Sequence, residues 1–129
     1  MNRIALSLAA LLGAGPALAE QVSALGTWTV AAVETDPSMP ITGVGVNDPA
    51  YMGAKLTIAR DAIRWNTAAA NGQGTYDACP APRFAAAATG VVVTCGGQPW
   101  GPDATLVPVA SGELRLPWYD GGILVLKRD

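Results

Sequence analysis

Hydrophobic and polar positions alternate in short runs along most of this chain, the pattern expected of β-strands with one buried face. The first run, residues 27–33, places Trp28, Val30 and Ala32 on the same face. Past the first twenty residues, no stretch repeats its apolar positions at helical spacing. The pattern therefore predicts an all-β protein.

The later runs are equally short and are separated by residues that favour turns. In residues 55–59 and 63–67, the expected inward positions are Leu56, Ile58, Ile63 and Trp65. The other candidate strands are residues 74–77, 83–88, 90–95, 105–109, 113–118 and 123–128. About eight such strands joined by local turns favour an antiparallel meander that closes into a small barrel. A β-sandwich is the alternative architecture.

Glycine and proline mark the connections between these runs. Together they supply 22 of the 110 residues from position 20 onward. Asn71-Gly72 is a strong signal for a type I′ hairpin, because both residues tolerate a positive φ. Residues 34–53 form a much longer connection, and a segment of this length is either functional or poorly ordered.

The first 19 residues have the organisation of a secretory signal peptide. Arg3 provides a positive charge, residues 4–12 are apolar, and the small-residue site Ala17-Leu18-Ala19 follows. The apolar run is interrupted too early for a membrane anchor, which needs about 20 residues. We expect cleavage near Ala19, which leaves residues 20–129 as one domain in the periplasm or outside the cell.

Cys79 and Cys95 are the two cysteines of the chain. In an oxidising compartment, one pair of cysteines predicts one disulfide. A redox-active pair normally has Cys-x-x-Cys spacing, which this pair lacks. We therefore expect a structural disulfide.

The composition excludes several kinds of chemistry. The chain has no histidine, so it cannot build a Ser-His-Asp or Cys-His arrangement and lacks the commonest ligand of transition metals. It is mildly acidic and carries no basic patch for nucleic acid. Asp36, Asp48 and Asp120 lie where turns are expected. We expect no catalytic, metal-binding or cofactor-binding residues.

The aromatic residues divide into two groups. Trp28 and Trp65 lie on predicted inward faces. Four others lie in loops or at a strand end just before a turn, and they form a candidate binding surface with one arginine. These five residues are Tyr51, Arg83, Trp100, Trp118 and Tyr119. Loop aromatics can anchor a partner. Alternatively, they fold back over an open end of the barrel. Arg83 follows Pro82 close to Cys79, on a segment that the disulfide would hold.

Two features at the ends of residues 20–129 resemble the calycin-type, lipocalin-like barrels. Gly26-Thr27-Trp28 opens the first strand with Gly-x-Trp, and the last strand ends with basic residues. The size and leader also resemble small exported bacterial META-type domains, although the Gly-Cys-Asn signature of that family is absent. The resemblance implies that Arg128, or Lys127 in a shifted register, covers Trp28 and closes the barrel.

These observations favour an exported protein that binds rather than catalyses. The first hypothesis is a protein-binding module, for example an inhibitor of an envelope hydrolase or protease. The second is a lipocalin-type carrier of a small apolar ligand, and the third is a structural envelope protein. A carrier would need a cavity above roughly 300 Å³ lined by apolar side chains.

Overall fold

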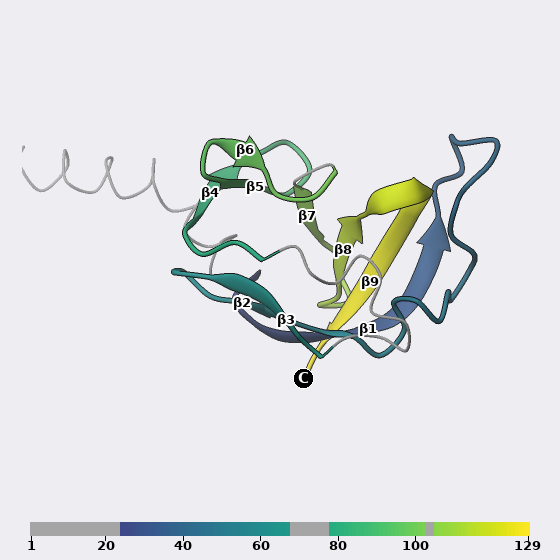
Figure 1. The fold of residues 1–129 in the computed structure, drawn as a ribbon, viewed down its shortest axis with the longest axis horizontal. Coiled ribbons are helices and arrows are strands. Elements are labelled where there is room, and N and C mark those ends of the chain that lie inside the picture. The colour runs from purple at the N-terminus through teal and green to yellow at the C-terminus, as the bar shows by residue number, and fades with distance from the viewer. Residues whose placement is uncertain (1–23, 68–77, 103–104) are drawn as a thin grey trace, which may run out of the picture.

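The computed structural model describes residues 24–67, 78–102 and 105–129, and in them it confirms the all-β fold. Figure 1 shows a strongly curved sheet whose strands wrap around a common core. The strands are β1 (Gly26–Thr35), β2 (Lys55–Ile58), β3 (Ile63–Thr67), β4 (Pro82–Ala86), β5 (Val91–Cys95), β6 (Gln98–Pro99), β7 (Thr105–Pro108), β8 (Leu114–Pro117) and β9 (Gly122–Arg128). A 3-10 turn, η1 (Tyr119–Gly121), precedes β9.

The sheet follows the order β3-β2-β1-β9-β8-β7-β5-β4, and all its pairings are antiparallel. β6 lies beside β5, off this path. The two ends of the order approach each other where Ile63 of β3 pairs with Cys79, just before β4. The result is a nearly closed barrel of eight strands, as the turn spacing predicted.

β1 is the longest strand, and it bends around the core at a bulge. Its register against β9 shifts between Val30 and Ala32. The inward face therefore passes from Val30 to Val33, which is fully buried, while Ala32 is half-buried. The prediction that Ala32 shares the inward face of Trp28 is wrong, because strict alternation cannot anticipate the extra residue of a bulge.

The barrel interior is filled by large apolar side chains from nearly every strand. The largest of those with essentially no exposed surface are Trp28, Val30, Val33, Leu56, Ile58, Ile63, Val91, Leu106, Leu114, Leu116, Leu124 and Leu126. A side chain with no accessible surface has no cavity beside it that is large enough for a water molecule. These residues therefore form a packed core, as expected for protein interiors.

The long connection after β1 is well organised and covers an otherwise open strand edge. β2 pairs only with the first half of β1, from Gly26 to Thr29. Beyond that point, the Val30 N–H donates to the carbonyl of Ala54 (2.9 Å), and the Asn47 N–H donates to the carbonyl of Val33 (2.8 Å). The loop thus replaces a neighbouring strand and protects the edge of β1.

Some predictions fall outside the described residues or differ from them. The leader, residues 1–19, and the hairpin at Asn71-Gly72 with the strand at 74–77 lie outside them. β6 was not predicted, because Gln98–Pro99 lies within a cluster of glycine and proline. Among the helices of the described residues, none has the length and apolar character needed to span a membrane.

Candidate functional site

One end of the barrel is closed by Trp28 and Arg128, which face each other across β1 and β9. The Arg128 guanidinium carbon lies 4.3 Å from the centre of the Trp28 ring, and the indole N–H donates to the carbonyl of Ala24 (2.9 Å). Arg128 also donates to the carbonyl of Leu25. We call these residues the closed end. They realise the geometry that the lipocalin resemblance implied, with Arg128 rather than Lys127 opposite Trp28.

Gly26 explains why glycine opens this Gly-x-Trp sequence. Its φ of +133° lies in a region that side chains rarely adopt. A Cβ built there would also lie 2.5 Å from Nη1 of Arg128. Glycine therefore permits both the backbone turn and the approach of Arg128 to Trp28.

The predicted disulfide between Cys79 and Cys95 is present. The Cα atoms lie 5.7 Å apart, a usual separation for a bonded pair. Cys79 is fully buried, and Cys95 is partly buried against the core. The bond joins the segment that pairs with β3 to the end of β5.

Three of the four loop aromatics proposed as binding residues are buried. Tyr51, Trp100 and Trp118 expose 3%, 2% and 4% of their surface. Their rings are therefore not available as exposed anchors for a partner. They follow the alternative interpretation, in which loop aromatics fold back over the barrel. The glycine and proline neighbours of Tyr51 and Trp100 correctly indicated loops, but they gave no signal that these rings are buried.

The buried tryptophans form a cluster that extends to the surface. The Trp118 ring centre lies 5.2 Å from Trp100, 5.8 Å from Trp65 and 5.2 Å from Tyr119. Nε1 of Trp65 is buried without a hydrogen-bonding partner in the described part of the chain. Tyr119 is 37% exposed, so it is the edge of this cluster that a partner could reach.

Arg83 is exposed on β4, as predicted, but its strand does not neighbour the one that leads into Tyr119. In the order β8-β7-β5-β4, its strand is three positions away from β8, which leads into Tyr119. Its cross-strand partner is Thr94, next to Cys95. The candidate surface of five residues therefore does not form one patch, and its binding role stays a prediction.

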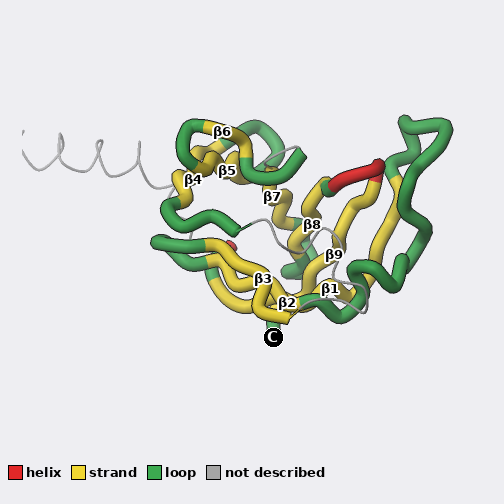
Figure 2. Tube along the Cα trace, viewed as in Figure 1, coloured by secondary structure: helices red, strands yellow, loops and turns green. Residues whose placement is uncertain are grey.

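The most exposed apolar side chains were missed by the sequence reasoning. Ile41 is 83% exposed, Val46 71% and Met39 41%, and all three belong to the loop after β1. Residues 37–47 contain no charged side chain, so isolated apolar residues among prolines and glycines were a signal available in the sequence. We call residues 36–48 together with η1 the loop end. Figure 2 shows this loop beside the 3-10 turn.

Backbone hydrogen bonds hold the loop end in place. The Asp36 N–H donates to the Gly121 carbonyl, and the Gly43 N–H donates to the Asp120 carbonyl, each at 2.8 Å. Asn47 adds a side-chain contact, because its Oδ1 accepts from the Val33 N–H at 3.0 Å. The loop that exposes the apolar side chains is thus anchored on both sides of its tip.

Two predicted turn aspartates stabilise this loop through their own backbone neighbours. Hydrogen bonds from the Ser38 hydroxyl and the Ser38 N–H lower the pKa of Asp36 below its ordinary value. The N–H groups of Ala50 and Gly45 lower the pKa of Asp48 in the same way. Both carboxylates therefore stay ionised and act as turn residues.

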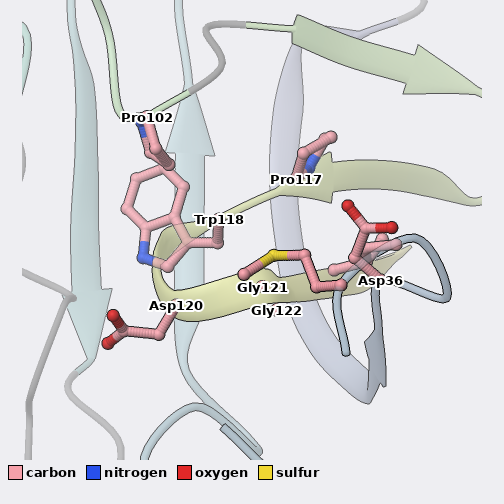
Figure 3. Close-up of a pocket in the computed structure, with 9 residues that line it drawn as sticks. Asp36, Pro102, Pro117, Trp118, Asp120, Gly121 and Gly122 are labelled. Carbon is pink, nitrogen blue, oxygen red and sulfur yellow. The ribbon is translucent and has the colours of Figure 1, made fainter. Parts of the chain in front are cut away.

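An open pocket of about 630 Å³ lies beside the loop end. Figure 3 shows Trp118 and Pro102 on one side of it and Pro117 and Asp36 on the other. Its remaining lining residues are Met39, Asp120, Gly121, Gly122 and Ile123. Pro117 follows the buried Leu116, and Ile123, its cross-strand partner, precedes the buried Leu124. Because side chains alternate between the two faces of a strand, Pro117 and Ile123 lie on the outer face of the sheet. The pocket is therefore a surface feature and not a barrel lumen.

The cysteine and acidic side chains of the described residues do not form a metal site. In residues 24–67, 78–102 and 105–129, no three Cys, Asp or Glu side chains gather closely enough to hold a metal ion. Comparisons with protein-family models, with curated proteins and with solved structures found no match to this chain.

Proposed function

We propose that this protein is an exported, non-enzymatic binding module that contacts a partner protein through its loop end. The observation that carries the proposal is the exposure of Ile41, Val46 and Met39 on a loop fixed by backbone hydrogen bonds. A loop whose backbone is already fixed loses little conformational entropy on binding. More of the free energy gained by burying its apolar side chains therefore contributes to affinity.

The charges around the loop end are consistent with a protein partner. Asp36 and Asp48 flank the loop in the chain, and the Asp120 side chain lies close to Gly43. Residues 36–54 and 116–122 contain no lysine or arginine. An apolar centre with a polar rim is the usual composition of a protein contact. An acidic rim would repel the anionic surface of a membrane. We therefore favour a partner protein with an apolar cleft and basic surroundings, such as an envelope hydrolase or protease that this module inhibits.

The packed interior gives no support to a carrier of small apolar ligands. The carrier hypothesis needs apolar walls around an open lumen, whereas the inward side chains of β1, β8 and β9 are almost completely buried. The pocket beside the loop end lies on the outer face of the sheet and is open to solvent, so it is not the enclosed lumen that the carrier hypothesis requires.

The proposal places the protein in the periplasm or outside the cell, after cleavage near Ala19. The disulfide supports this placement, because such bonds persist in oxidising compartments. We further infer kinship with the calycin-type barrels, supported by the contact between Trp28 and Arg128. A META-type relationship has the leader and the size of the domain as its support.

Photo-crosslinking in the native cell tests the contact surface. A photoreactive residue replaces Ile41 at the loop end, and a matched chain carries it at Ala85, which is on β4. We expect an adduct of defined mass from position 41 and none from position 85. Equal adducts from both positions, or none from position 41, would refute the proposed surface.

The captured partner then allows a direct affinity measurement. We expect Ile41→Ser to weaken binding at least about tenfold, as truncation of a central contact residue does, whereas Ala85→Ser leaves it unchanged. Both positions are accessible to water, so both proteins should fold equally well. Unchanged affinity in Ile41→Ser would remove the loop from the interface.

A further inference from the structure

The methionines of this chain differ in their access to water. Met1 lies in the expected leader, outside the described residues. Met52 is partly buried and packs against the core. Met39 is 41% exposed and belongs to the loop end. Oxidation of a side-chain sulfur depends on whether a dissolved oxidant can reach it. Of the two methionines that the structure describes, Met39 is therefore the more open to oxidation.

The pocket beside the loop end gives a small oxidant a path to the Met39 side chain. Met39 forms part of the pocket wall, together with Pro117 and Ile123, and the pocket of about 630 Å³ is open to solvent. Hydrogen peroxide is far smaller than this space. The oxidant can therefore reach Met39 without any opening of the fold.

Gly121 shows where the Met39 sulfur lies. A Cβ built on Gly121 would be 2.9 Å from Sδ of Met39 and 2.7 Å from Cγ2 of Thr42. Gly121 also has a φ of +80°, which favours glycine. The absence of a side chain at position 121 thus leaves the space that the thioether occupies. Because Gly121 also lines the pocket, the sulfur lies at the pocket wall, against the backbone of η1.

The described contacts that fix the loop do not use the Met39 side chain. The Asp36 N–H donates to the Gly121 carbonyl, and the Gly43 N–H donates to the Asp120 carbonyl. Met39 itself contributes its backbone N–H, which donates to the Asp36 carbonyl at 3.1 Å. A chemical change at the thioether therefore alters the polarity of the surface and removes none of these backbone bonds.

We propose that Met39 is an oxidation site at which hydrogen peroxide converts the apolar surface of the loop end into a polar one. A lone pair of the sulfur forms an S–O bond with one peroxide oxygen as the O–O bond breaks. The proton on the transferred oxygen passes to the departing hydroxide, which leaves as water. The thioether is oxidised to a sulfoxide, and the peroxide is reduced by two electrons.

The sulfoxide lowers the affinity of the loop end for an apolar partner surface, a consequence that rests on the proposed binding function. Its oxygen is a hydrogen-bond acceptor, and burial of that oxygen against apolar atoms costs free energy. A methionine sulfoxide reductase restores the thioether, with one enzyme for each sulfoxide epimer. Met39 therefore makes contact through the loop end sensitive to peroxide in a reversible way.

Peptide mass mapping after peroxide treatment tests the site without any partner. In the folded protein with its disulfide intact, we expect Met39 to gain one oxygen about tenfold faster than Met52. In concentrated urea the two rates should converge, because unfolding exposes both side chains. The melting temperature should fall by no more than about 2 °C on oxidation of Met39. Equal rates in the folded protein, or a larger fall, would overturn the assignment of Met39 as a surface oxidation site.

The effect on binding is measured with the partner captured through position 41. We expect peroxide to weaken binding at least about tenfold in the original protein and in Met52→Leu. Met39→Leu keeps an apolar side chain of similar volume but has no sulfur, so its affinity should survive the same treatment. Unchanged affinity of the treated original protein, or an equal loss in Met39→Leu, would overturn the switch. Neither result would affect the cross-linking test, which uses untreated protein.

Discussion

The two ends of strands β1 and β9 use apolar residues in opposite ways. At the closed end, Trp28 is 1% exposed, lies beneath Arg128 and donates its N–H to a carbonyl. At the loop end, Ile41 and Val46 project outward although the backbone beneath them is fixed. At one end of these two strands, the closed end, the apolar residues stabilise the fold. At the other, the loop end, the exposed apolar side chains contribute little to stability. Exposed apolar side chains on a fixed backbone are what the proposed contact surface requires.

Truncation of the buried aromatic should have the largest effect on stability. We expect Trp28→Ala to lower the free energy of unfolding by about 3–5 kcal/mol, because it removes a large core side chain and leaves a cavity. Ile41→Ala, at the loop end, should change it by no more than about 0.5 kcal/mol. Urea unfolding of both variants measures the difference. Similar losses in the two would erase the distinction between the ends.

The anchoring of the loop depends on Asn47. This residue has a φ of +51°, and its side chain accepts the Val33 N–H. Asn47→Ala leaves that N–H unsatisfied and should cost about 1–2 kcal/mol. Asn47→Asp is the matched control, because it keeps the acceptor and tolerates this backbone conformation. If both variants unfold at the same urea concentration as the original protein, the side chain does not anchor the loop.

The cation at the closed end should have a smaller effect. Arg128→Met removes the charge above the Trp28 ring but keeps much of the aliphatic stem, and we expect a loss of about 0.5–1 kcal/mol. Lys127→Met is the control at the neighbouring position, where a carboxylate oxygen of Glu113 is 3.7 Å from the ammonium nitrogen. An exposed pair of this kind contributes little. A larger loss in Lys127→Met would contradict the assignment of Arg128.

Acidification should have the smallest effect on stability, and we expect that effect at the loop end. The pKa of Asp48 is lowered in the folded protein, so its contribution to stability is present above the unfolded pKa and is lost as pH falls through the folded pKa. Amide NMR shifts of Gly45 and Ala50, which donate to Asp48, follow this titration. We expect a midpoint below about 3.9, the ordinary value for aspartate. A midpoint at or above that value would mean that these hydrogen bonds do not form in solution.

Much of the fold could be predicted from the sequence because strand alternation and turn residues act locally. The inward positions Leu56, Ile58 and Ile63 follow from a period of two. The bulge after Val30 could not be predicted, because it arises from how β1 fits β9 across the barrel. The pairing of Cys79 with Ile63 likewise depends on contacts between distant segments.

The candidate site was harder to predict than the fold. Trp100 and Trp118 occupy loop sequences, but tertiary packing buries their rings against each other. Ile41 and Val46 have the opposite fate, although their residue types are typical of cores. Local sequence states which segments are loops. It does not state which loop side chains find space inside the molecule.

The most direct test of the account measures stability and partner binding together in Ile41→Ser and Arg128→Met. The partner is the one captured by cross-linking at position 41, and binding is measured where both proteins are folded. We predict that Ile41→Ser keeps the melting temperature and loses affinity, whereas Arg128→Met lowers the melting temperature and keeps affinity. The reverse pattern, with Ile41→Ser melting early or Arg128→Met failing to bind, would contradict the division of the molecule into a stabilising end and a binding end.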